Sequence, residues 1–158
     1  MVIEDYVSFE VAKLLKEKGF DGKCSRIWAK EENESPLRIA MSLFVEGEEV
    51  ADRETVEKAT SYNNKYKFRT SVMGYLCPTL QMVMKWLREE HNLFIEVQYA
   101  TSLLLQPHTT IYFQIYYMSL DYTTSGKNML PDDYIREYYT SYEEACEAAI
   151  KYCLEKLI

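Results

Sequence analysis

The sequence CPTLQMVMKWLREEHNLFIEVQY, residues 77–99, decides the fold class of this 158-residue chain. Its first half places five side chains at the spacing of one helix face, namely Leu80, Val83, Met84, Leu87 and His91. Asn92 then suits a left-handed helix stop, and apolar and polar residues alternate over 93–99 as in a half-buried strand. The stretch therefore predicts a helix over 79–91 that leads directly into a strand.

Two further helices are predicted near the ends of the chain. Ser8 is placed to cap a helix over 8–18, and Gly19 is placed to end it. Near the other end, Ser141 and Glu144 form the S-x-x-E pattern of a capping box. This box begins a predicted helix over 141–157 that carries an apolar stripe.

The segments between these helices have the character of strands. Alternation or β-rich composition predicts strands at 24–30, 37–45, 93–99 and 111–117, with 134–139 as a candidate last strand. Asp52 is placed to cap a short helix over 52–59, and SYNNKYKF at 61–68 suggests a turn into a short strand. We therefore expect an α+β fold, a mainly antiparallel sheet packed by about three helices. It would form a single domain over residues 1–158, with 46–71 as a candidate peripheral elaboration.

Composition argues against several classes of function. There are 18 basic and 25 acidic residues, which gives a net charge of -7. The basic residues are scattered along the sequence, so we expect nucleic acid to be an unlikely partner. No apolar run approaches the roughly 20 residues of a membrane helix. The N-terminus lacks the pattern of a signal peptide, so we expect a cytoplasmic protein.

The four cysteines do not form a recognisable motif. Cys24, Cys77, Cys146 and Cys153 include no C-x₂-C pair of the kind found in zinc or redox sites. We interpret them as buried, reduced thiols that behave as small apolar side chains. The sequence assigns no metal site and no cofactor.

Three blocks together resemble a known group of proteins. They are DYVSFEVAKLLKEKGFD (5–21), CPTLQMVMKWLREEHNLFIEV (77–97) and SYEEACEAAIKYCLEKLI (141–158). In order and spacing they resemble an uncharacterised family of small phage- and prophage-associated proteins of gut Bacteroidales. The resemblance implies a mobile-element origin and production in a bacterial host cell, and it brings no catalytic residue. Residues 31–72 and 100–135 lie outside it.

The two histidines offer little for catalysis. His108-Thr109-Thr110 precedes a strand and resembles half of the paired His-x-Thr motif of 2H phosphoesterases. His91 is followed by Asn92 and Leu93, so the second motif is absent. We interpret His108 as a turn residue and His91 as a packing or capping residue at a helix end. No catalytic residue is assigned.

Tyrosine, with 14 copies, is the unusual component of the chain. The strand IYFQIYY presents Tyr112, Gln114 and Tyr116 on one face, and Tyr138 and Tyr139 follow nearby. These five residues are the candidate surface for a partner or a ligand. Three interpretations remain open: helices cover the face, a protein binds it, or a small ligand binds it.

The leading hypothesis is a non-enzymatic protein that binds another protein, either a host protein or a second copy of itself. In a phage, such binding would serve host modulation or counter-defence. One alternative is a binding protein for a small ligand or a nucleotide signal. A phosphoesterase-like hydrolase that uses His108 is a further alternative.

Overall fold

The computed structural model describes residues 5–66, 71–100, 110–118 and 126–158, and for 63–66 the backbone only. Internal contacts group the chain into two compact units, Met1–Thr79 (unit 1) and Leu80–Ile158 (unit 2). Each unit combines helices with a three-stranded antiparallel sheet, which confirms the α+β class. The strands fall in two sheets where the sequence led us to expect one. A single domain over 1–158 stays a prediction.

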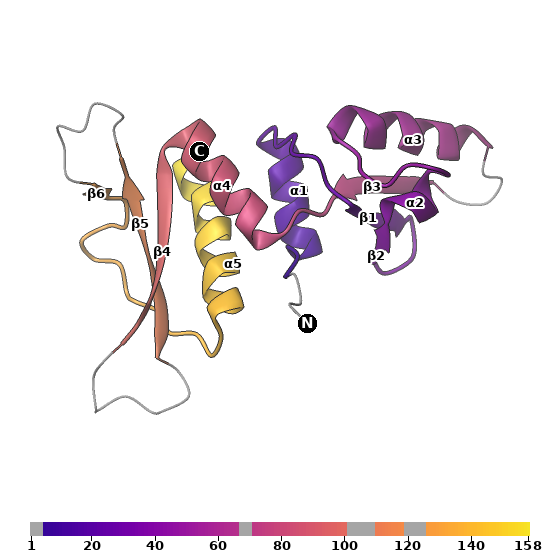
Figure 1. The fold of residues 1–158 in the computed structure, drawn as a ribbon. Coiled ribbons are helices and arrows are strands. Elements are labelled where there is room, and N and C mark those ends of the chain that lie inside the picture. Colours follow the sequence, from indigo (N-terminus) through magenta and orange to yellow (C-terminus); the bar gives the residue numbers. More distant parts are fainter. Residues whose placement is uncertain (1–4, 67–70, 101–109, 119–125) are drawn as a thin grey trace. The chain divides into compact units, whose positions relative to one another are not determined.

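Unit 1 contains a small sheet with strand order β2-β1-β3 (Figure 1). Its elements in chain order are α1 (Phe9–Glu17), β1 (Arg26–Glu31), β2 (Leu37–Ala40), α2 (Met41–Phe44), α3 (Arg53–Tyr66) and β3 (Val72–Leu76). Helices α1 and α3 both pack against β3, which places the core of the unit between these helices and the sheet.

Both ends of α1 follow the predicted capping chemistry. The Ser8 hydroxyl accepts a hydrogen bond from the Val11 amide at 3.4 Å. Gly19 has φ +83°, the left-handed conformation that glycine adopts without steric cost. The Phe20 amide donates to the Leu15 carbonyl at 3.0 Å, and the Phe20 ring is buried. These contacts form the Schellman stop expected from the sequence.

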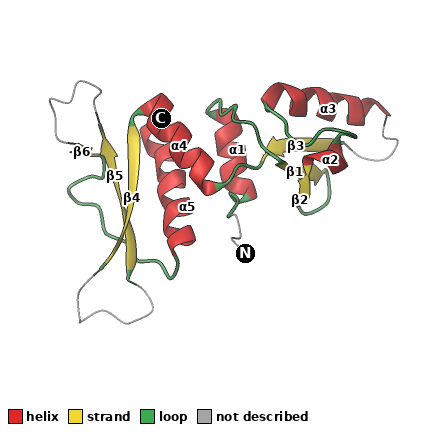
Figure 2. Ribbon diagram, viewed as in Figure 1, coloured by secondary structure: helices red, strands yellow, loops and turns green. Residues whose placement is uncertain are grey.

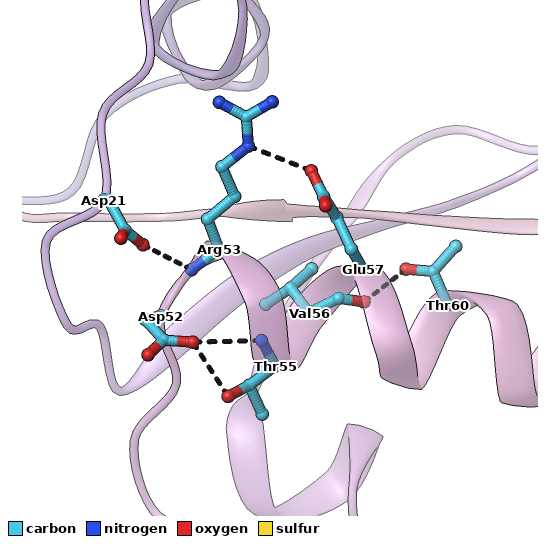
Figure 3. A network of polar contacts seen from close by, with 7 residues as sticks. All are labelled: Asp21, Asp52, Arg53, Thr55, Val56, Glu57 and Thr60. Carbon is cyan, nitrogen blue, oxygen red and sulfur yellow. Dashed lines mark hydrogen bonds and ion pairs between the residues drawn. The ribbon is translucent and has the colours of Figure 1, made fainter.

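Helix α3 begins with a polar network (Figure 3). The Asp52 carboxylate accepts hydrogen bonds from the Thr55 amide at 2.9 Å and from the Thr55 hydroxyl at 2.8 Å, which confirms the predicted cap. Asp21, in the segment after α1, accepts a hydrogen bond from the Arg53 amide at 2.9 Å. The start of α3 is therefore tied to a segment distant in sequence.

Helix α3 is longer than the sequence indicated. The turn expected from residue 61 onward is wrong as far as Tyr66, because the helix continues to that residue; 67 and 68 lie outside the described residues. The helix packs on β3: Val56 and Ala59 are buried, and Gly74 leaves room for Val56 and Thr60 to approach the strand. These contacts make this part of the candidate peripheral segment 46–71 a contributor to the core of unit 1.

The strand predicted over 37–45 is correct only as far as Ala40. Residues 41–44 form one helical turn, with Met41 fully buried and Leu43 78% exposed. In a strand these two side chains would share one face. The turn instead sends Met41 into the core, and its amide donates to the Ser25 carbonyl at 2.9 Å.

Unit 2 has the order helix, three strands, helix (Figure 2). Its elements are α4 (Leu80–His91), β4 (Leu93–Tyr99), β5 (Ile111–Tyr117), β6 (Lys127–Asn128), α5 (Tyr142–Tyr152) and a closing π-helical turn, η1 (Cys153–Leu157). The sheet order is β4-β5-β6. Helices α4 and α5 lie on one side of the β4–β5 hairpin. There they bury Ile111, Phe113 and Ile115 of β5.

The predicted junction between α4 and β4 is confirmed. Asn92 has φ +55°, and β4 begins at the next residue, so no loop separates the helix from the strand. The His91 ring packs edge-on against Trp86 with centroids 4.6 Å apart, which fits its interpretation as a packing residue at a helix end.

The strand predicted over 134–139 is wrong. Tyr139 alone makes an isolated bridge, to Ile111, whereas β6 lies in a segment for which no strand was predicted. A turn closed by the Tyr134 amide and the Pro131 carbonyl, 3.0 Å apart, curves the chain before it can pair along β5. After the bridge, the Ser141 hydroxyl caps α5 by accepting from the Glu144 amide at 3.1 Å.

Candidate functional site

The predicted tyrosine surface lies on the outer face of the β4–β5 hairpin. Tyr112, Gln114 and Tyr116 are half-buried and alternate with core residues of β5. Their partners across the ladder are, in the same order, Gln98, Glu96 and Phe94. We call these six residues the tyrosine face. Because α4 and α5 pack on the other side of the hairpin, the described helices of unit 2 leave this face uncovered except at Phe94, where the Arg88 guanidinium of α4 lies 6.0 Å from the ring centre.

Hydrogen bonds link the polar groups of the tyrosine face. The Tyr112 hydroxyl donates to Gln98 Oε1, and the Tyr116 hydroxyl donates to Gln114 Oε1. Burial raises the pKa of Tyr116, and the neighbouring Glu96 carboxylate raises that pKa further. The Tyr116 hydroxyl therefore stays protonated at neutral pH, and the face is a hydrogen-bonded aromatic layer with Glu96 as its one acid.

The structure brings four of the five predicted site residues together. Tyr138 meets the Tyr112 ring edge-on at 6.1 Å, and the Arg136 guanidinium lies 4.2 Å from the centre of the same ring. Tyr139 belongs elsewhere, because it stacks on Phe113 at 5.9 Å on the core side of β5. Burial is the main cause that raises the pKa of Tyr139.

A hollow of about 230 Å³ adjoins the tyrosine face. Polar side chains dominate its lining, among them Gln114, Asn128, Asp132 and Arg136. Small-molecule sites usually measure roughly 300–1,000 Å³. This hollow is therefore too small for a nucleotide-sized ligand.

Strand β4 has a free edge. The even-numbered residues of β4 form the hydrogen bonds to β5. Just beyond the two ends of β4, the Ala100 amide donates to the Thr110 carbonyl and the Met118 amide donates to the Asn92 carbonyl, which sets this parity. The backbone groups of the odd-numbered residues 93–99 therefore point away from β5. No segment pairs with them in the part of the chain that the structure describes.

Unit 1 carries a second candidate surface that the sequence did not indicate. It consists of four half-buried rings, Tyr6, Phe9, Trp28 and Tyr75, with cations over them. The five cations are Lys13, Lys16, Arg26, Lys30 and Arg38. We call this set of nine residues the aromatic–cation face.

Strand pairing assembles the aromatic–cation face. Trp28 on β1 is opposite Arg38 on β2 and Tyr75 on β3, so residues far apart in sequence form one row across the sheet. The alternation of Arg26, Trp28 and Lys30 along β1 is the one local signal of this face, because alternate residues of a strand share a face. The rest depends on the register, which is why the basic residues looked scattered.

Groups for catalysis are scarce in the described residues. All four cysteine thiols are buried as predicted, and burial raises the pKa of Cys24 and Cys153 to about 12. No group of three metal-ligating side chains occurs among the described residues. His108 lies outside them.

Helix length and apolarity give one further result. Within the described ranges, none of the helices is both long enough and apolar enough to cross a membrane.

Comparisons with known proteins add no relative. No protein-family model, curated protein or solved structure matches this chain.

Proposed function

We propose that this protein works without catalysis by binding another protein, and that the partner adds a strand to the free edge of β4. Strand addition supplies main-chain hydrogen bonds, while side chains beside the edge provide specificity. The observation that carries the proposal is the seven-residue edge of β4, unpaired in the described part of the chain, next to the half-exposed tyrosine face.

The edge of β4 lacks the protection that the edges formed by β6 and β2 have. Proteins commonly protect sheet edges with short strands, charges, proline or bulges. Strand β6 has two residues and includes Lys127, and β2 has four and includes Arg38. Strand β4 pairs with β5 over seven consecutive positions without a bulge. Its residues with outward backbone groups are uncharged: Leu93, Ile95, Val97 and Tyr99.

Glu96 favours a partner other than a second copy of this chain. A symmetric antiparallel pairing of two β4 strands centred on Glu96 would place two carboxylates opposite each other, which is unfavourable. A partner strand with a basic or amide side chain opposite Glu96 avoids this repulsion. The resemblance to phage- and prophage-associated proteins leads us to place that partner among host proteins, in host modulation or counter-defence.

A proline at Val97 tests strand addition. Val97 directs its amide away from β5, so Val97→Pro removes an edge donor and leaves the β4–β5 ladder complete. Val97→Ala is the matched control, because it shortens the same side chain and keeps the amide. Affinity capture from host lysate with each variant as bait should retain the partner on wild type and Val97→Ala. Val97→Pro should retain less than about one tenth of the partner that wild type retains.

Hydrogen–deuterium exchange of the purified complex locates the contact. The amides of Ile95, Val97 and Tyr99 should exchange more slowly when the partner is bound. Equal capture by all three baits, or unchanged exchange at these amides, contradicts strand addition. A wild-type dimer in solution that Val97→Pro dissociates would identify the partner as a second copy instead.

A further inference from the structure

We infer that the aromatic–cation face of unit 1 binds single-stranded nucleic acid. Proteins that bind such strands combine aromatic side chains, on which bases stack, with cations that follow the phosphates. The aromatic–cation face has both kinds of group on one surface of a small sheet. This site belongs to unit 1 and the β4 edge to unit 2, so either proposal can fail without the other.

The four rings form one continuous row. Phe9 meets Trp28 at 6.1 Å and Tyr75 at 5.2 Å, both edge-on. Arg38 joins Tyr6 to this group, since its guanidinium lies 5.1 Å from the centre of Tyr6 and 5.9 Å from that of Trp28. The Trp28 ring is held in place because its Nε1–H donates to the Val7 carbonyl at 3.0 Å. The connected rings offer several stacking positions.

The cations of this face remain available for phosphates. Among the described residues none of the five forms an ion pair; each lies 4.9–5.6 Å from the centre of a ring. A cation–π contact at an exposed site is weaker than a base stacked on the same ring. A base can therefore take the place of a cation over a ring, while the displaced ammonium or guanidinium turns to a phosphate.

A hollow of about 370 Å³ on this face suits one base. Phe9 and Tyr75 line it together with Lys13 and Lys30. Glu31 and Glu32 also line it, so one side of the hollow repels phosphate. We place the phosphates of a bound strand along the lysine and arginine side chains, away from these two carboxylates.

The rings favour a nucleic acid strand over other anions. An acidic peptide would use the cations but would have no flat groups for Trp28 and Tyr75. A free nucleotide would occupy the hollow alone, whereas the row extends beyond it to Arg38 and Tyr6. The net charge of -7 does not prevent binding, because salt screens charges more than about 8–10 Å away under physiological conditions.

The test measures binding of the whole chain to a fluorescently labelled single strand of about 12 nucleotides. Anisotropy titrations between about 50 and 200 mM salt should show a log–log slope no steeper than about -3.5, since each of five neutralised phosphates contributes about -0.7. Arg38→Ala combined with Lys30→Ala should weaken binding about tenfold and make the slope shallower by about 1.4. The control is Lys23→Ala, an exposed cation of unit 1 beside Asp52, which should change binding by less than about twofold.

Tryptophan fluorescence gives a second measurement that does not depend on charge. In a Trp86→Phe background, Trp28 is the remaining tryptophan, and a stacked base should quench it. Equal binding of a poly-glutamate peptide, or of a mononucleotide, would overturn the inference. It would also fail if the folded protein, checked by circular dichroism, showed no binding at about 50 mM salt, or if Trp28 emission did not change on binding.

Discussion

At the scale of single residues, local hydrogen bonds and backbone conformations set where the helices of this chain begin and end. Ser8, Gly19, Asp52 and Asn92 each adopt the capping or stopping role that their type suggested. A cap depends on an oxygen and an amide three residues apart, so neighbours in sequence contain the information. Ser141 follows the rule only in part: it caps α5, but Glu144 accepts from the Thr140 amide at 3.1 Å, outside the expected capping box.

Asp52 should make stability depend on pH. Hydrogen bonds from Thr55 lower the pKa of the Asp52 carboxyl in the folded protein. A lowered folded pKa adds stability that is present above the unfolded value of about 3.9 and is lost as pH falls through the folded value. Wild type should therefore exceed Asp52→Ala in melting temperature at neutral pH, and this difference should narrow as the solution is acidified below about pH 4.

Asp52→Asn is the matched comparison for this effect. Its amide oxygen caps the helix but does not titrate, so the difference between Asp52→Asn and Asp52→Ala should stay constant with pH. Thermal melts of the three proteins across the acid range make the measurement. If the difference in melting temperature between wild type and Asp52→Ala is the same at all pH values, protonation of the Asp52 carboxylate is not linked to folding.

At the scale of elements, the sequence predicted the long amphipathic segments and failed where the length of an element depends on its tertiary contacts. Helix α4 and strands β4 and β5 appear as expected, because their apolar patterns are regular. Helix α3 continues beyond its predicted end, and Thr60, the first residue past that end, packs where Gly74 has no side chain. Strand β3 is the next element in the chain, but this contact depends on how helix and strand pack together, which the pattern of residues 60–66 alone does not show.

Gly74→Ala should weaken the contact between α3 and β3. An added Cβ would lie 2.8 Å from Val56 Cγ1 and 3.0 Å from Thr60 Oγ1, closer than side chains normally pack. We expect a loss of about 1–3 kcal/mol in the free energy of unfolding, measured by urea denaturation. Val56→Ala removes the nearer atom, so the double variant should lose less than the two single variants together, with a coupling of about 0.5–3 kcal/mol. Simple additivity would show that the Gly74–Val56 contact does not limit packing.

At the scale of the whole molecule, the sequence predicted the α+β class but only part of the candidate surfaces. The alternation of β5 was enough to place Tyr112, Gln114 and Tyr116 on one face. Tyr139 was grouped with them by proximity in sequence, and its ring turned to the core because its backbone bridges Ile111. The aromatic–cation face was missed because three strands and a helix contribute to it.

Alkylation of the cysteines, two in each unit, should report whether each unit is folded. All four are buried, and Cys24 and Cys153, with pKa values of about 12, would have thiolate fractions on the order of one in a thousand at pH 9. In native protein we expect negligible alkylation by iodoacetamide at pH 8, and little increase at pH 9. In concentrated guanidinium chloride all four should react, as counted by intact mass. Rapid alkylation of the native protein would show that a unit opens readily.

The single-residue junction at Asn92 has a consequence for how this protein can vary. Because α4 passes into β4 without a loop, the last turn of the helix determines which β4 side chains face the core and which join the tyrosine face. Adding one residue there would exchange the two sets, and adding two would restore them. Single-residue insertions and deletions should therefore be poorly tolerated at Asn92, because this junction fixes both where the helix ends and which face of the strand each side chain joins.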